Sequence, residues 1–410
     1  MNEENLKKDF YAIAQFGMLK KGGVSRIAFS KEDMTARKYL GRIMEAEGLS
    51  VSIDSVGNIR GKRPGQKDLS PVIMGSHLDT VPFGGHYDGT IGVLGGLAVI
   101  REMNKQQIKT ARPVEVMNLS CEESSRFSVG TVGSKILAGS FPKDQLKQRK
   151  DADGKSVYDA MTLAGYAPEA METAILSPDD IHAFIELHIE QGLVLESENK
   201  AVGIVTDIAA PTRFKVVIEG RADHSGNTPM NLRKDALTGA CELILGVENI
   251  TTNKAGPHTV GTVGFATIEP GVMNVIPGRV EIGIDIRDIH MKDKEIALKK
   301  LLKLMDNIST QRGLVITHEI ISHEAPVPLS DKIIQILEKE AHTMGILPKK
   351  MISGGGHDAM NMARITDAGL IFVPSIRGIS HNMAEKTDFK DIMAGCKLMY
   401  RSVIQLANQG

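Results

Sequence analysis

Cysteine is scarce in this chain of 410 residues, and long apolar runs are absent from it. The three cysteines, Cys121, Cys241 and Cys396, lie far apart without paired spacing, which excludes a disulfide framework and fits a reducing compartment. No run approaches the ~20 apolar residues of a membrane span, and the N-terminal segment lacks the apolar centre of a signal peptide. We therefore expect a cytoplasmic protein without membrane association.

An excess of charge of either sign is also missing. The 49 basic residues nearly balance the 50 acidic ones, giving a net charge of −1. A chain so balanced has no electrostatic reason to bind nucleic acid or an anionic membrane. Its composition, 42% hydrophobic and 24% charged, is typical of a folded domain, and its length predicts two or three of them.

The first half of the chain alternates between strand and helix patterns. An amphipathic helix is expected over 31–47, and apolar runs follow at 71–76, 114–120 and 183–190. Helical patterns such as 89–104 separate these runs. Strands that alternate with helices predict an α/β domain with a largely buried sheet.

Residues 213–322 follow a different pattern. Strands are expected over 213–219, 258–269, 279–288 and 314–321, with helices over 232–250 and 293–311. This β-α-β-β-α-β order is the ferredoxin-like unit. Afterwards the α/β pattern returns, with helices over 331–344 and 389–407 and a short strand over 370–374. We predict an α+β domain, residues 211–325, inserted into a larger α/β domain formed by 1–210 and 326–410.

A first candidate metal-binding segment is the motif GSHLDT, followed by a glycine-rich loop that ends at Asp88. His77 ends an apolar run, and the carboxyl ends of strands are where ligands bind in open α/β sheets. Asp79 lies on the same side of an extended chain and is placed to orient that imidazole, while Asp88 can bridge two cations. The alternative is a capped turn with a surface His and Asp.

A second candidate is the pair Glu122-Glu123, which follows the strand pattern VEVMNLSC. At a strand end, one carboxylate can bind a metal ion while the other faces the attacking water as a general base. The alternative is a solvated charge pair.

Two further histidines belong to the same predicted sheet. His188 shares one face of the strand AFIELHIE with two glutamates, and His381 follows the short strand IFVPS. An edge strand with a polar face is the alternative for His188. Three histidines and two carboxylates suit zinc, manganese or cobalt, and a shared aspartate between ions ~3.5–4 Å apart is a co-catalytic arrangement.

The inserted domain carries polar residues that its own fold does not require. His224 lies in a loop. The alternative to a functional role is that it is an ordinary surface histidine. Arg287 ends a buried strand, where its planar fork suits a substrate carboxylate or, equally, a salt bridge to Asp285 or Asp288. The three glycines before His357 allow close approach to a ligand, although an ordinary loop would use them as well.

Taken together, the motifs resemble those of the dinuclear aminoacylase and carboxypeptidase-type metallohydrolases over nearly the whole chain. Within that superfamily the chain is most similar to the branch of N-carbamoyl-L-amino acid hydrolases, β-ureidopropionases and allantoate amidohydrolases. The motifs that carry this resemblance are GSHLDTVPFGGHYDG, CEESSRF, ELHIEQG, DHSGNTPM, NVIPG, DIRD, GGGHDA and PSIRGISHN.

The resemblance implies a role for each matching residue. Asp88 would bridge two divalent ions, Glu122 would be the general base, and Asp79 would steady His77. His224 would reach across a homodimer to polarise the scissile carbonyl. The implied metal ligands are His77, Asp88, Glu123, His188 and His381, and the implied substrate-binding residues are Gln191, Asn274, Arg287 and His357.

The implied fold is a zinc-peptidase-like catalytic domain with an inserted ferredoxin-like lid that also forms the dimer. The implied reaction is hydrolysis of the ureido group of an N-carbamoyl-L-amino acid, with release of ammonia and carbon dioxide. Allantoate amidohydrolase is the alternative, but the stretch Pro211-Thr212-Arg213 lacks the glutamine common in those enzymes. The chain also departs from the family at Ser225 and Asn227. An aminoacylase or dipeptidase, and a binding protein without activity, are the remaining alternatives.

Overall fold

The computed structural model describes residues 1–253 and 255–409, which form two compact units. The larger unit is Met1–Thr206 with Pro328–Gly410, and the smaller unit is Asp207–Val327. Within the described residues, no helix is both long enough and apolar enough to cross a membrane.

The larger unit is built on a nine-stranded sheet with the order β1-β2-β4-β3-β5-β15-β6-β13, in which β14 also pairs with β6. Its central neighbours β4, β3, β5 and β15 run parallel, and β1 and β2 join as antiparallel strands. This arrangement confirms the predicted α/β class. The strands are β1 (Ser50–Ile53), β2 (Ile59–Arg63), β3 (Val72–His77), β4 (Val114–Leu119), β5 (Ala183–Ile189), β6 (Gly203–Ile208), β13 (Val327–Pro328), β14 (Lys349–Ser353) and β15 (Asp367–Val373).

The larger unit contains both long and short helices. They are α1 (Glu3–Ala14), α2 (Lys31–Ala46), α3 (Thr90–Lys105), α4 (Val132–Leu137), α5 (Gln145–Gln148), α6 (Val157–Leu163), α7 (Val194–Ser197), α10 (Asp331–Thr343), α11 (Asp358–Met362) and α12 (Phe389–Ala407). Leu187 of β5 packs beside Gly95 of α3 and Gly395 of α12, while its neighbour Glu186 accepts a hydrogen bond from the first turn of α11. Because successive side chains of a strand point to opposite faces, β5 is covered on both sides. That burial excludes the edge-strand alternative for His188.

The parallel strands bring the predicted metal ligands to one edge of the sheet. His77 is the last residue of β3, and His188 is the second-last residue of β5. Glu122 and His381 follow the ends of β4 and β15. Three residues at these strand exits have left-handed backbone, namely Cys121 (φ 54°), Gln191 (φ 58°) and His381 (φ 52°). Non-glycine residues rarely adopt this conformation, and such strain gathers where a site demands a sharp turn.

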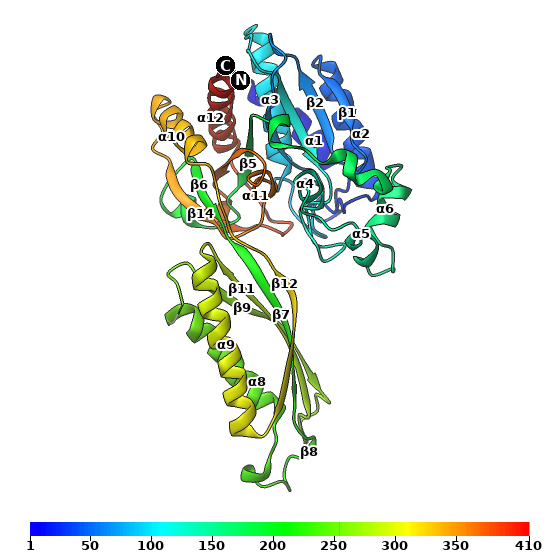
Figure 1. Ribbon diagram of the computed structural model, residues 1–410, viewed down its shortest axis with the longest axis vertical. Coiled ribbons are helices and arrows are strands. Elements are labelled where there is room, and N and C mark those ends of the chain that lie inside the picture. The colour runs from blue at the N-terminus through cyan, green and yellow to red at the C-terminus, as the bar shows by residue number, and fades with distance from the viewer. Residues whose placement is uncertain (254, 410) are drawn as a thin grey trace. The chain divides into compact units, whose positions relative to one another are not determined.

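The smaller unit is a four-stranded antiparallel sheet, with the order β12-β7-β11-β9, packed against two helices (Figure 1). The elements follow the predicted β-α-β-β-α-β order. They are β7 (Ala210–Glu219), α8 (Ala236–Asn253), β9 (Val260–Glu269), β11 (Arg279–Asp288), α9 (Met291–Arg312) and β12 (Val315–His323). The helix predicted from residue 232 begins later because Asp235 accepts hydrogen bonds from the amides of Leu237 and Thr238 and thereby caps it.

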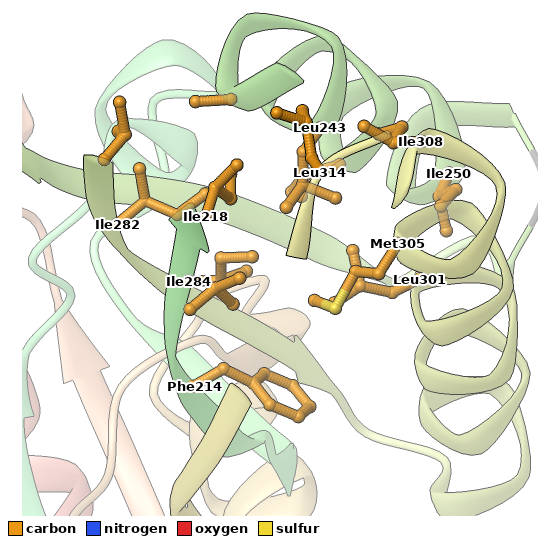
Figure 2. Close-up of a cluster of buried hydrophobic side chains, with 14 of the residues drawn as sticks. Phe214, Ile218, Leu243, Ile250, Ile282, Ile284, Leu301, Met305, Ile308 and Leu314 are labelled. Atoms are coloured by element: carbon orange, nitrogen blue, oxygen red, sulfur yellow. The ribbon is translucent and has the colours of Figure 1, made fainter. Parts of the chain in front are cut away.

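One face of this smaller sheet is buried under α8 and α9. Along β7 and β11 every second residue is buried, as expected for strands that are covered on one face. Figure 2 shows the resulting cluster, in which Phe214, Ile218, Ile282 and Ile284 of the strands face Leu243, Leu301 and Met305 of the helices. The edge strands β9 and β12 are largely exposed and carry apolar side chains, including Val260, Phe265, Val315 and Ile320.

Candidate metal centre

Asp88 lies at the centre of the predicted site, in the loop before α3. Its Oδ1 is 2.9 Å from Nε2 of His188 and 3.8 Å from Nε2 of His77. All three side chains are buried, and their ligand atoms lie within 4.8 Å of one another, close enough to share one ion. Such burial excludes the surface-turn alternative for His77 and Asp88. Gly89 lets the loop pass so near, since a Cβ there would lie 2.4 Å from Nε2 of His77.

A second group of potential ligands uses the other oxygen of Asp88. Its Oδ2 is 3.1 Å from Nε2 of His381, and that nitrogen is 3.7 Å from Oε1 of Glu123. These three residues also have ligand atoms within 4.8 Å of one another. The two groups share only Asp88, and together they contain all five predicted ligands.

Glu122 is directed into the same site. Its Oε2 is 3.7 Å from Nε2 of His77, and its side chain is only 12% exposed. Burial, followed by the charge of Glu123, raises the pKa of Glu122 well above its usual value. The pair is therefore not solvated, which excludes the simple surface-charge alternative.

Asp79 makes contacts that the sequence did not predict. The main-chain carbonyl of Asp79, rather than its carboxylate, accepts the hydrogen bond from Nδ1 of His77, at 2.9 Å. The carboxylate is 3.9 Å from that nitrogen and instead accepts the main-chain amides of Glu122 (3.2 Å) and Glu123 (3.0 Å). Nδ1 of His188 likewise lies 2.9 Å from the carbonyl of Ile189. Both rings are thus held with Nε2 facing the site, the orientation that metal binding requires.

The charges of the site fit divalent cations. Burial and the charge of Asp88 raise the pKa of Glu123 well above its usual value, because several carboxylates are forced together away from water. Burial by itself would raise the pKa of Asp88. Hydrogen bonds to His188 and His381 outweigh this effect and lower the pKa well below its usual value. Among the described residues, Oε1 of Glu123 has no hydrogen-bond donor although it is buried. A cation would satisfy such an oxygen.

Gln191 and His357 lie against this group. Nε2 of Gln191 donates to Oδ2 of Asp88 at 2.9 Å, and the ring of His357 meets that of His188 edge-on, with centroids 4.5 Å apart. Burial and the charge of His188 lower the pKa of His357 well below its usual value. Glu186 lies close enough to His188 and His357 to share a metal ion with them. Its oxygens, however, already accept hydrogen bonds from Oγ of Ser76 and the amide of Ala359, each at 2.8 Å.

The other predicted site residues belong to the smaller unit. Residues 223–224 and 275–276 form a two-stranded ladder, β8 (Asp223–His224) and β10 (Val275–Ile276), which sets Asn274 beside the His224 loop. Nδ1 of His224 accepts the amides of Gly226 (3.1 Å) and Asn227 (3.2 Å). Those bonds place the ring proton on Nε2, so exposed His224 is a hydrogen-bond donor.

Arg287 forms the salt bridge that was the alternative to substrate binding. Its Nε and Nη2 bond both oxygens of Asp285, each at 3.0 Å. Asp285 also accepts Nε of Arg213 at 3.0 Å. Binding of a substrate carboxylate at Arg287 therefore requires that Asp285 share or release this guanidinium.

Sequence reasoning missed two charged residues that support the site. Arg26 is fully buried and bonds the carbonyl of Leu78 (2.6 Å) and Oγ1 of Thr90 (3.1 Å), which flank His77 and Asp88. Glu385 accepts the amide of Asp88 at 3.1 Å. A glutamate four residues after His381 was visible in the sequence, whereas nothing near Arg26 pointed to the site.

The fold and this group of side chains fit a hydrolase that binds divalent metal, and comparison with known proteins agrees on the class. The model of peptidase family M20/M25/M40 matches residues 73–405. The chain belongs to that family, and it is a hydrolase of amide or ureido bonds.

Several named relatives are similar to the chain over nearly its whole length. An N-carbamoyl-L-amino acid amidohydrolase of Geobacillus stearothermophilus is 38% identical, covering 98% of both chains. A ureidoglycolate hydrolase of Oryza sativa subsp. japonica is 38% identical over 100% of this chain and 86% of its own. An allantoate amidohydrolase of Bacillus subtilis (strain 168) is 35% identical, covering 96% and 95%. A crystal structure of an amidase of the hydantoinase/carbamoylase family from Burkholderia multivorans superposes with a TM-score of 0.92 at 34% identity, covering 100% and 98%.

Proposed function

We propose that this protein is a dinuclear metal-dependent amidohydrolase that cleaves the ureido group of N-carbamoyl-L-amino acids. The observation that carries the proposal is the position of Asp88, whose two oxygens serve two separate groups of ligands. His77 and His188 would complete one ion site, and Glu123 and His381 the other. The ligand types suit zinc, manganese or cobalt.

Glu122 is the proposed general base and acid. When bound, the two ions would supply Lewis-acid chemistry and make a water molecule more acidic. Glu122 takes the proton from the attacking water and later delivers it to the departing amine. Its position beside His77 and its protection from solvent support this role. The net reaction converts the ureido group and one water into ammonia, carbon dioxide and the free amine.

The smaller unit would supply the remaining contacts. His224 would donate its Nε2 proton to the scissile carbonyl oxygen, a role that its fixed tautomer supports. Asn274 and Arg287 would hold the substrate carboxylate, and Gln191 and His357 would line the reacting end. Asp79 would act through the main chain of the Glu122-Glu123 pair.

The substrate preference is tested by ammonia release. After chelation and addition of Mn²⁺, Zn²⁺ or Co²⁺ in turn, we expect release from N-carbamoyl-L-amino acids to exceed that from allantoate and N-carbamoyl-β-alanine. We rank allantoate below N-carbamoyl-L-amino acids because the chain lacks, before Arg213, the glutamine that is common in allantoate amidohydrolases. Faster turnover of allantoate would instead establish the alternative activity. Cleavage of dipeptides or acyl amino acids without any ureido activity would overturn the proposal.

We also propose a homodimer formed through the smaller unit. The edge strands β9 and β12 expose apolar side chains next to unpaired backbone, the kind of surface that joins sheets of two subunits.

Three free cysteines, of which Cys121 and Cys396 are buried, support placement in the cytoplasm.

The dimer makes a prediction about mixed variants. If His224 acts in the partner's site, Glu122→Gln and His224→Ala are each inactive alone, yet a heterodimer contains one complete site. After dissociation and random reassociation of equal amounts, we expect about a quarter of wild-type activity. The measurement is ammonia release before and after mixing, with each variant alone carried through the same treatment. Lack of recovery, despite heterodimers detected by mass spectrometry, would show that His224 does not act across the interface.

A further inference from the structure

Glu385 is a buried carboxylate, 4% exposed, that the proposed chemistry does not use. Its Oε1 accepts the main-chain amides of Tyr87 (2.9 Å) and Asp88 (3.1 Å), almost 300 residues earlier in the chain. Its Oε2 accepts the hydroxyl of Ser380 at 2.8 Å. One side chain therefore joins the loop of the shared aspartate to the turn that carries His381.

Gln191 closes these contacts into a ring. Its Nε2 donates to Oδ2 of Asp88 at 2.9 Å and lies 3.1 Å from Oγ of Ser380. Each of the four residues, Glu385, Asp88, Gln191 and Ser380, thus bonds the next. Such a closed polar network fixes its members more firmly than separate pairs do.

The loop is shaped around this carboxylate. A Cβ on Gly85 would lie 2.0 Å from Oε1 of Glu385, so only glycine lets the backbone approach so closely. The His381 side chain, by contrast, is 52% exposed and has left-handed backbone. Packing against neighbours does little to hold an exposed ring, and the bond between Ser380 and Glu385 ties the turn of His381 to the Asp88 loop.

We propose that Glu385 is a positioning residue that presets Asp88 and His381 for the ions and thereby sets the affinity of the centre for divalent metal. This inference rests on the proposed function, because it presupposes that both residues are ligands. A charged acceptor bonded to two amides of the Asp88 loop makes strong hydrogen bonds. Residues that orient ligands in this way typically contribute ten- to hundredfold in metal affinity or activity.

The test compares Mn²⁺ binding by Glu385→Gln, Ser380→Ala and the wild type, using calorimetric titration of chelated protein. Glutamine keeps the shape of Glu385 without its charge, and Ser380→Ala breaks only the bond to the His381 turn. We expect both variants to bind Mn²⁺ roughly 10- to 100-fold more weakly. Their kcat should be low at limiting Mn²⁺ and recover as Mn²⁺ is raised, with KM little changed. The melting temperature of the metal-free protein reports whether the fold is intact.

Asp151→Asn is the matched control. Oδ1 of Asp151 also accepts two main-chain amides, from Asp153 and Lys155, and its Oδ2 accepts a side chain, that of Arg126. We expect its Mn²⁺ affinity to equal that of the wild type. Affinities of Glu385→Gln and Ser380→Ala within about twofold of the wild type would overturn the inference. If Glu385→Gln does not fold, Ser380→Ala decides alone. Failure of the wild type to bind Mn²⁺, Zn²⁺ or Co²⁺ would instead refute the proposed function.

Discussion

Glu122→Gln is expected to lower kcat by about 10²–10⁴-fold while the protein still binds two metal ions. The amide has almost the same shape as the carboxylate but cannot take a proton from water. Glu122 lies beside the ion groups without belonging to either of them. Removal of its charge should therefore stop proton transfer and leave the ligands in place. Ammonia release and metal content of the same samples measure the two effects.

The adjacent residue provides the control for this experiment. Glu123→Gln changes the same functional group one position further along, but Glu123 belongs to an ion group and has a buried oxygen without a donor among the described residues. We expect this variant to lose metal, and activity to decline with it. If Glu122→Gln turns over at a near-normal rate, another group must be the base. If it loses metal as Glu123→Gln does, it is a ligand.

Asp88→Ala is expected to abolish binding of both ions, whereas loss of one histidine should affect mainly one. Asp88 is the only residue that the two groups share, and each of its oxygens faces a different group. His381→Ala should retain the ion held by His77 and His188. Metal content after dialysis against low Mn²⁺ should therefore fall from two ions in the wild type to about one in His381→Ala and none in Asp88→Ala.

The comparison between variants separates a shared ligand from general damage. Melting temperatures of the metal-free proteins measure general damage, which we expect to be larger for Asp88→Ala because Asp88 is bonded to His188, His381 and Gln191. A single ion retained by Asp88→Ala would show that Asp88 serves one site only. Equal loss in His381→Ala would show that the ions bind as one unit.

The sequence predicted the elements whose periodicity is strong. The strand that ends at His77, the helices near 31–46 and 389–407, and the β-α-β-β-α-β order of the smaller unit are present as expected. Other elements were missed, including the helix α1 and the short strands β6 and β14. A strand of five or six residues at a sheet margin carries too few alternating positions to be distinguished from a loop. The start of α8 was misplaced because the Asp235 cap was not recognised.

What the sequence determined by itself is the chemistry available to the site: which histidines and carboxylates follow strands, and so face one edge of a parallel sheet. What only the tertiary structure decided is how those groups are held. The carboxylate of Asp79 holds the amides of Glu122 and Glu123, and Glu385 holds the loop of Asp88. The side-chain periods of strands and helices arise from local backbone geometry, so they can be recognised in the pattern of neighbouring residues. Contacts between distant loops have no period, and they exist only once the sheet has brought its strand ends together.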